Sequence, residues 1–287
     1  MTMQRYPWNV ERSASMQKPA LWLWISILAA LLAVAGSVIA LSVSSIYSGL
    51  TPVFLPQGIA QDIANLSVAS PVWMILAVLA LRGSLRAYLL WLGVLVFTVY
   101  NYFIYTFSVP FGPLFLLWIA VLGLSIYSLI GGLTSVDHEA VRSSFTSERA
   151  VKVVAWFLIV TGVLFAVLWL SEDVPALLAG RTPQSVIDTG LPTNPVHILD
   201  LAFFLPAVII TGLLLLKRKP IAYTLAPAFI VFLILTGIPI LITPAVQTAR
   251  GETAGWGVLA PIGTLTVLLL CVLIWLLQTI RAAKRPK

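Results

Sequence analysis

The residue types best suited to chemistry lie at the start of a long apolar run, in Asn194-Pro195-Val196-His197-Ile198-Leu199-Asp200. Asn is a favoured helix N-cap and Pro suits the first helical position, so this stretch predicts a helix start. His197 and Asp200 are three residues apart and would share one face of that helix. Asp200 would lie roughly 7 Å inside the helix end, where an ionisable group is costly unless it faces protein or water. The pair is therefore a candidate functional site.

The composition indicates that membrane-spanning helices must position these side chains. Of 287 residues, 60% are hydrophobic and 9% are charged, whereas soluble proteins are about one quarter charged. Apolar runs of about 20 residues fit transmembrane helices, because the strands of a barrel are shorter and alternate in polarity. The sole cysteine, Cys271, lies in such a run, which excludes a disulfide framework and a thiolate metal cluster.

We predict an all-α polytopic transmembrane helical bundle of eight spans. A polar cytoplasmic segment, residues 1–19, precedes the bundle at 20–280, and a basic cytoplasmic tail, 281–287, follows it. The spans are expected at about 20–43, 62–81, 87–107, 114–133, 151–170, 195–216, 221–243 and 255–280. Residues 44–61 and 171–193 are predicted to be external loops. The acidic residues of the second loop are interpreted as solvated charges; they are Glu172, Asp173 and Asp188.

The distribution of Lys and Arg predicts the orientation of the bundle. With both termini inside, the basic turns at 82–86 and 217–219 face the cytoplasm, and only Arg181 and Arg250 are external. Enrichment of basic residues on the cytoplasmic side is the usual rule for membrane proteins. The formal net charge of +7 therefore reflects topology. We expect the lipid bilayer, and no nucleic acid, as a partner.

The chain contains a candidate internal repeat at a shift of about 135 residues. The two segments share prolines, basic turns, Ala-Tyr pairs and polar pairs: Pro71 with Pro206, Arg82 with Lys217, Ala87-Tyr88 with Ala222-Tyr223, and Asp62 and Asn65 with His197 and Asp200. Four spans in each half would give a parallel 4+4 repeat about an axis along the membrane normal. The alternative is a coincidental likeness between two apolar hairpins.

The repeat predicts a polar pocket near the outer face. Asp62 and Asn65 would lie near the outer end of the second span, and Asn101 and Tyr105 at a similar depth in the third. Polar side chains avoid lipid, so we expect them to converge on an internal pocket. The candidate ligand-binding or proton-handling residues are His197, Asp200, Asp62, Asn65, Asn101, Tyr105 and Asn194.

These side chains are compatible with more than one role. Asp62, Asp200 and His197 could bind a metal ion or another cation, exchange protons, or hold a polar ligand. The alternative is helix–helix hydrogen bonding, worth about 1 kcal/mol per bond. Gly36 and Gly131-Gly132 are predicted to allow close helix packing.

Several chemistries lack their sequence motifs. The chain has no His-Glu-x-x-His zinc motif, no Gly-x-Ser-x-Gly elbow and no phosphate-binding Gly-x-x-x-x-Gly-Lys loop. Its two histidines, His138 and His197, are predicted on opposite sides of the membrane, so they cannot jointly ligate a haem. No cofactor is predicted.

Three stretches carry a resemblance to a known family: Asn194 to Asp200, Gln61-Asp62 and Tyr100-Asn101-Tyr102. In these stretches the chain resembles a family of uncharacterised bacterial multi-pass membrane proteins, over most of residues 45–245. The resemblance implies the architecture and a bacterial inner (plasma) membrane location. It supplies no activity and no catalytic residues.

Three functions fit these observations. The leading hypothesis is a transporter-like protein that handles a small molecule or ion through the outer polar pocket, which predicts a water-accessible path across the bundle. A membrane-embedded enzyme would use His197 and Asp200 as an acid–base pair on a lipid or quinone headgroup, through a lateral opening. A scaffold or accessory subunit would use the polar side chains only to hold helices together, in a dry and fully hydrogen-bonded cluster.

Overall fold

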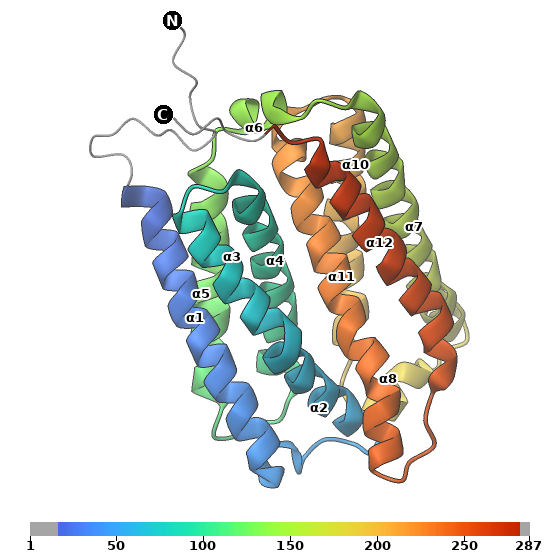
Figure 1. The fold of residues 1–287 in the computed structure, drawn as a ribbon. Helices are drawn as coiled ribbons and strands as arrows, with labels where there is room; N and C mark the ends of the chain where they lie inside the picture. Colours follow the sequence, from blue (N-terminus) through green and yellow to red (C-terminus); the bar gives the residue numbers. More distant parts are fainter. Residues whose placement is uncertain (1–16, 282–287) are drawn as a thin grey trace, which may run out of the picture.

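The computed structural model describes residues 17–281, and every regular element in that part of the chain is a helix. Eight segments are long and apolar enough to cross a membrane (Figure 1). They are α1 (Gln17–Ser42), α2 with α3 (Leu55–Ala64 and Ser70–Leu81), α4 (Leu85–Ser108), α5 (Phe115–Thr134), α7 (Glu148–Leu178), α9 with α10 (Pro195–Leu199 and Leu205–Leu216), α11 (Pro220–Ala249) and α12 (Leu259–Gln278). The chain is a multi-pass membrane protein, and the predicted all-α bundle is confirmed.

The two ends of the bundle carry different connections. α1 begins and α12 ends at one end, which also holds the turns at 82–84 and 217–219 and the short helix α6 (His138–Ser144). The opposite end holds the short helix α8 (Gln184–Thr189) and the connections between α1 and α2, α4 and α5, and α11 and α12. This second end is called the site end below.

Three spans are longer at the site end than the sequence predicts. The second span begins at Leu55 rather than near residue 62, because Pro56 at the first turn favours a helix start there. α7 continues past residue 170 to Leu178, and α11 continues past residue 243 to Ala249. Much of both predicted external loops is therefore helical. Of the predicted terminal segments, residues 1–16 and 282–287 lie outside the described residues.

The backbone repeats at the shift found in the sequence. A π-helical turn interrupts the second span at Asn65–Ala69 and the sixth span at the equivalent Asp200–Phe204. The helices that follow these turns also end at equivalent positions. Each then enters a turn with a positive φ, 87° at Gly83 and 54° at its counterpart Arg218. Because two unrelated hairpins would not share these irregularities, the backbone supports the predicted parallel repeat.

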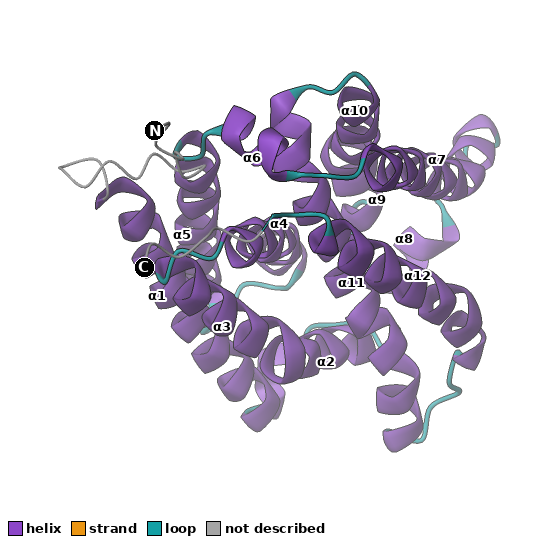
Figure 2. Ribbon diagram, turned by 45° about the horizontal axis from the view of Figure 1, so that its top comes forward, coloured by secondary structure: helices purple, strands orange, loops and turns teal. Residues whose placement is uncertain are grey.

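The two halves differ in how their outer helices pack. In the first half, α1 packs closely on α5, and the Trp22 ring occupies the space that a side chain at Gly131 would need. In the second half, the equivalent helix α7 packs closely on α10, where a Cβ at Gly212 would lie 2.7 Å from the Ala155 carbonyl oxygen. α7 makes few contacts with α12. The second half is therefore less closely packed between α7 and α12, while α4 and α11 lie at the centre of the bundle (Figure 2).

Candidate functional site

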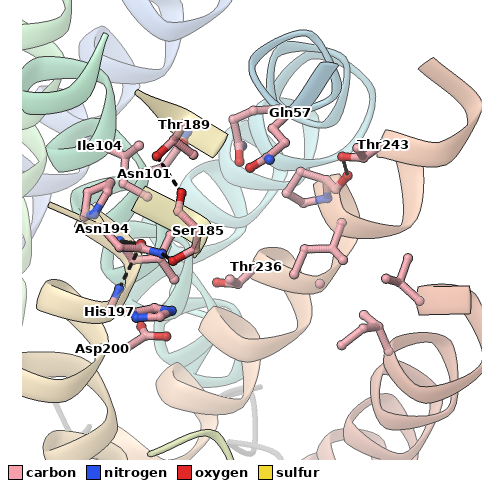
Figure 3. Close-up of a pocket in the computed structure, with 18 of the residues that line it drawn as sticks. Gln57, Asn101, Ile104, Ser185, Thr189, Asn194, His197, Asp200, Thr236 and Thr243 are labelled. Carbon is pink, nitrogen blue, oxygen red and sulfur yellow. Dashed lines mark hydrogen bonds between the residues drawn. The ribbon is translucent and has the colours of Figure 1, made fainter. Parts of the chain in front are cut away.

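A cavity of about 650 Å³ lies at the site end, with α7 and α12 among its walls. Residues of α2, α4, α8, α9 and α11 also line it (Figure 3). It reaches from Thr189 and Gln247 near the loops to Leu205 and Leu269 inside the bundle. Leu269 is ten residues into α12, a depth of about 15 Å at the helical rise. Most lining residues are apolar, and the acidic ones lie on or beside α7, α8 and α9, with His197, whereas α2, α11 and α12 contribute uncharged polar side chains such as Gln57, Thr243 and Thr266.

His197 lies on the polar side of this cavity and is only 4% exposed. Its Nδ1 is 3.0 Å from a carboxylate oxygen of Asp173, and its Nε2 is 3.9 Å from Glu172. The imidazole also stacks on Trp169, with 4.6 Å between the ring centroids. Both carboxylates lie on the part of α7 that the sequence predicted to be loop. An imidazole held between carboxylates can exchange protons or hydrogen-bond a ligand.

Asp200 begins the π-helical turn of the sixth span and is 8% exposed. Its Oδ2 accepts a hydrogen bond of 2.8 Å from the Trp169 indole N–H, and the Tyr100 side chain lies beside the same carboxylate. His197 and Asp200 share the cavity side of their helix, as predicted. Within residues 17–281 they form no hydrogen bond to each other, since each is bonded to a residue of α7.

Asn194 caps α9, as the sequence predicts. Its Oδ1 accepts hydrogen bonds from the backbone N–H groups of Val196 at 2.9 Å and His197 at 3.3 Å. Its amide nitrogen donates to Ser185 Oγ on α8 at 3.0 Å, and the Ser185 N–H donates to Glu172 at 2.8 Å. These bonds hold α8 against the site end of the cavity (Figure 3).

A second polar cluster lies between α2 and α4, in the first half of the chain. Asp62 is 2% exposed and accepts hydrogen bonds from the hydroxyls of Tyr105, at 2.9 Å, and Tyr47. Burial, followed by the charge of Asp62, raises the pKa of Tyr47 well above its usual range, so this hydroxyl stays a donor. Asn65 accepts a hydrogen bond of 3.3 Å from the Asn101 amide. This cluster is largely satisfied internally.

The structure thus divides the predicted constellation in two. The predicted residues that line the cavity are Asn101, Tyr105, Asn194, His197 and Asp200. Asp62 and Asn65 do not line it, because Tyr105 and Asn101 of α4 bond to them and present their own side chains to the cavity. Among residues 17–281, no group of three or more His, Cys, Asp or Glu side chains is arranged to hold a metal ion. The three candidate metal ligands, Asp62, His197 and Asp200, therefore do not form a common metal site.

Trp169 and Thr236 were not among the predicted site residues, and Glu172 was predicted to be a solvated loop charge. All three line the cavity. A signal for two of them was present, because Trp169, Glu172 and Asp173 follow the i, i+3, i+4 spacing of one helix face. This spacing could be recognised only if α7 was expected to continue beyond its apolar core.

The site as a whole joins two chemical environments. A buried imidazole, carboxylates and amides lie at one side of the cavity, and aliphatic and aromatic side chains of α11 and α12 form much of the rest. Such a surface suits an amphipathic small molecule.

No family model, no curated protein and no solved structure matches the chain.

Proposed function

We propose that this protein takes a small molecule or ion into an outward-facing cavity and carries it across the membrane, as transporters do. The observation that supports this function is the cavity itself, which continues from the site end into the bundle as far as Leu269. Transporters commonly bind their substrates between structural repeats, and π-helical turns within helices are frequent at functional sites. Here Asp200 stands at the π-helical turn that interrupts the sixth span, and Asn101 approaches from the other half of the chain.

We further propose that the site end faces outward, across a bacterial inner membrane. The basic turns at 82–86 and 217–219 lie at the opposite end of the bundle. Basic residues concentrate on the cytoplasmic side of membrane proteins, so this distribution supports cytoplasmic termini.

Cysteine labelling tests the outward-facing cavity. Cys271 is the only cysteine, so a Cys271→Ser background is free of native thiols. In intact cells, a membrane-impermeant maleimide should label Thr236→Cys, which lines the cavity, and should not label Ser125→Cys, which is fully buried elsewhere. Ser143→Cys, exposed at the opposite end, should label only after permeabilisation. Absence of Thr236→Cys labelling, or labelling of Ser143→Cys in intact cells, would overturn the proposed cavity or its orientation.

The transport step needs a separate test, because a one-sided cavity is only a binding site. A transporter exposes its site to each side in turn. Thr236→Cys should therefore also label in inside-out vesicles, more slowly than in intact cells, while Ser125→Cys stays unlabelled. Labelling of Thr236→Cys in intact cells but not in inside-out vesicles would contradict the proposed transport.

The two alternatives have weaker support. An enzyme that uses His197 and Asp200 as an acid–base pair on a lipid or quinone headgroup is less favoured, since both side chains are already bonded to α7, through Asp173 and Trp169. A scaffold suits the internally bonded cluster around Asp62. It gives no reason for a cavity of about 650 Å³ beside that cluster.

A further inference from the structure

The charged side chains on the cavity wall are acidic, apart from the imidazole of His197. Glu172, Asp188 and Asp200 line the cavity. None of the lysines and arginines within residues 17–281 does. A protonated His197 would be matched by Asp173, which lies 3.0 Å from its Nδ1 and is not a lining residue. The wall therefore favours positive charge in the cavity.

Aromatic rings line the same space. They are Phe54, Tyr100, Tyr105, Phe165, Trp169 and Phe232. Trp169 donates its indole N–H to the Asp200 carboxylate, so the edge of an aromatic ring and an acidic group lie together, while His197 stacks on one face of this ring. The face of an aromatic ring attracts organic cations, and combinations of such rings recognise quaternary ammonium groups.

Asn101 supplies a hydrogen-bond acceptor on the cavity wall. This side chain is 3% exposed and lines the cavity. Its amide nitrogen donates to Asn65 at 3.3 Å, while its amide oxygen accepts no hydrogen bond from any residue of the described range 17–281. Among the described residues, the fully enclosed side-chain atoms without a partner are Trp73 Nε1, Ser125 Oγ and Ser128 Oγ, so the Asn101 oxygen is open to the cavity rather than sealed in the protein. A positively charged or N–H-bearing ligand would satisfy it.

The size and lining of the cavity indicate an organic cation rather than a metal ion. A bare ion would leave most of about 650 Å³ unfilled, and residues 17–281 hold no metal-binding group of three His, Cys, Asp or Glu. We infer that the cavity binds a lipophilic organic cation, with its charge near Asp200, Glu172 and Trp169 and its apolar body against α11 and α12. This inference rests on the proposed function and names its substrate class.

Binding of two matched ions tests the inference. Tetraphenylphosphonium and tetraphenylborate have nearly the same size and shape and opposite charge. The full chain, purified in detergent, should bind radiolabelled tetraphenylphosphonium saturably in equilibrium dialysis, and radiolabelled tetraphenylborate, measured in a separate sample because the two ions precipitate together, should bind much more weakly. Because each carboxylate contributes a charge-assisted interaction, Glu172→Gln should weaken binding about tenfold or more. Asp200→Asn should do the same.

Glu172→Gln is the decisive variant, because its side chain is 32% exposed and can keep its bond to the Ser185 N–H. Glu139→Gln is the matched control, since Glu139 lies on α6 at the opposite end and its side chain is 58% exposed. It should bind as the unmodified protein does. Equal loss in both variants, or none in Glu172→Gln, would overturn the assignment of these carboxylates.

The outcomes separate this inference from the proposed function. Equal or tighter binding of tetraphenylborate would overturn cation selectivity, as would absence of saturable tetraphenylphosphonium binding. Neither result affects the labelling of Thr236→Cys, which tests the outward-facing cavity without any ligand. Failure of that labelling would overturn the proposed function directly.

Discussion

Gly93 of α4 contacts Ala228 of α11, and the two residues are each other's counterparts in the internal repeat. A Cβ at Gly93 would lie 2.6 Å from the Ala228 carbonyl oxygen and 3.0 Å from its Cα. Contact between equivalent positions is expected where a two-fold axis passes through an interface. The crossing of α4 and α11 therefore marks the axis that relates the two hairpins.

Gly93→Ala should destabilise the protein, because its new methyl group would meet backbone rather than a movable side chain. Overpacking of this kind costs about 1–3 kcal/mol. Thermal unfolding in detergent measures the change. Gly123→Ala on α5 is the control, since no atom lies within 4 Å of the position of its Cβ. Equal unfolding temperatures for the two variants would show that the central crossing tolerates a side chain.

Tyr47→Phe and Tyr105→Phe should each lower stability. Both remove a hydroxyl that donates to Asp62, a carboxylate only 2% exposed, and an unsatisfied buried group costs about 1–3 kcal/mol. The double variant should depart from the sum of the single changes, because both hydroxyls bind one carboxylate. Tyr127→Phe, at a position 65% exposed, should leave the unfolding temperature unchanged. A loss no larger than that of Tyr127→Phe would contradict a structural role for this cluster.

Substitution of Asn194 should separate the helix cap from the contact with α8. Asn194→Ala removes both and should cost about 1 kcal/mol of stability. Asn194→Ser keeps a capping oxygen, so its stability should be nearly unchanged, yet it loses the bond to Ser185. Tryptic cleavage after Arg181, in the connection before α8, should be faster in both variants. If only the Ala variant is cleaved faster, the contact with Ser185 does not hold α8.

His138 should make stability depend on pH. Burial lowers the pKa of its imidazole, which the neighbouring Asp137 opposes, and Nδ1 lies 2.9 Å from Thr224 Oγ1. The unfolded chain then takes up the proton first, near pH 6.5. The stability from neutral His138 is therefore complete above that pH and is lost as the pH falls below it.

Thermal unfolding at pH 7.5 and 5.5 checks this dependence. The unmodified protein should lose more stability on acidification than His138→Gln does, because the variant has no proton to take up. Because both proteins share all other titratable groups, the difference between their losses of stability reports on His138 alone. Equal losses of stability in the two proteins would show that the pKa of His138 is the same in the folded and the unfolded chain.

The sequence alone predicted the helical class, the number of spans and the shift of the repeat. The class and the number of spans are local properties, because the bilayer demands an apolar run of fixed length and places basic residues at one side, and the shift of the repeat is found by comparing the chain with itself. Asn194 was predicted to cap its helix for the same reason, since a cap depends on near neighbours. The ends of α2, α7 and α11 were missed because polar residues there remain helical. Glu172 and Asp173, for example, find partners in Ser185 and His197.

Only the tertiary structure decided where the cavity lies between the two halves and which polar residues reach it. Glycines allow a neighbouring helix to pack closely in both halves. Which helix packs there depends on the shapes of side chains that are distant in the sequence. Trp22 fills the face at Gly131 and closes α1 on α5, whereas Gly212 meets α7 and leaves few contacts between α7 and α12. The same packing places Tyr105 between Asp62 and the cavity. Spacing along one helix predicts a shared face, but what that face meets depends on residues far away in the chain.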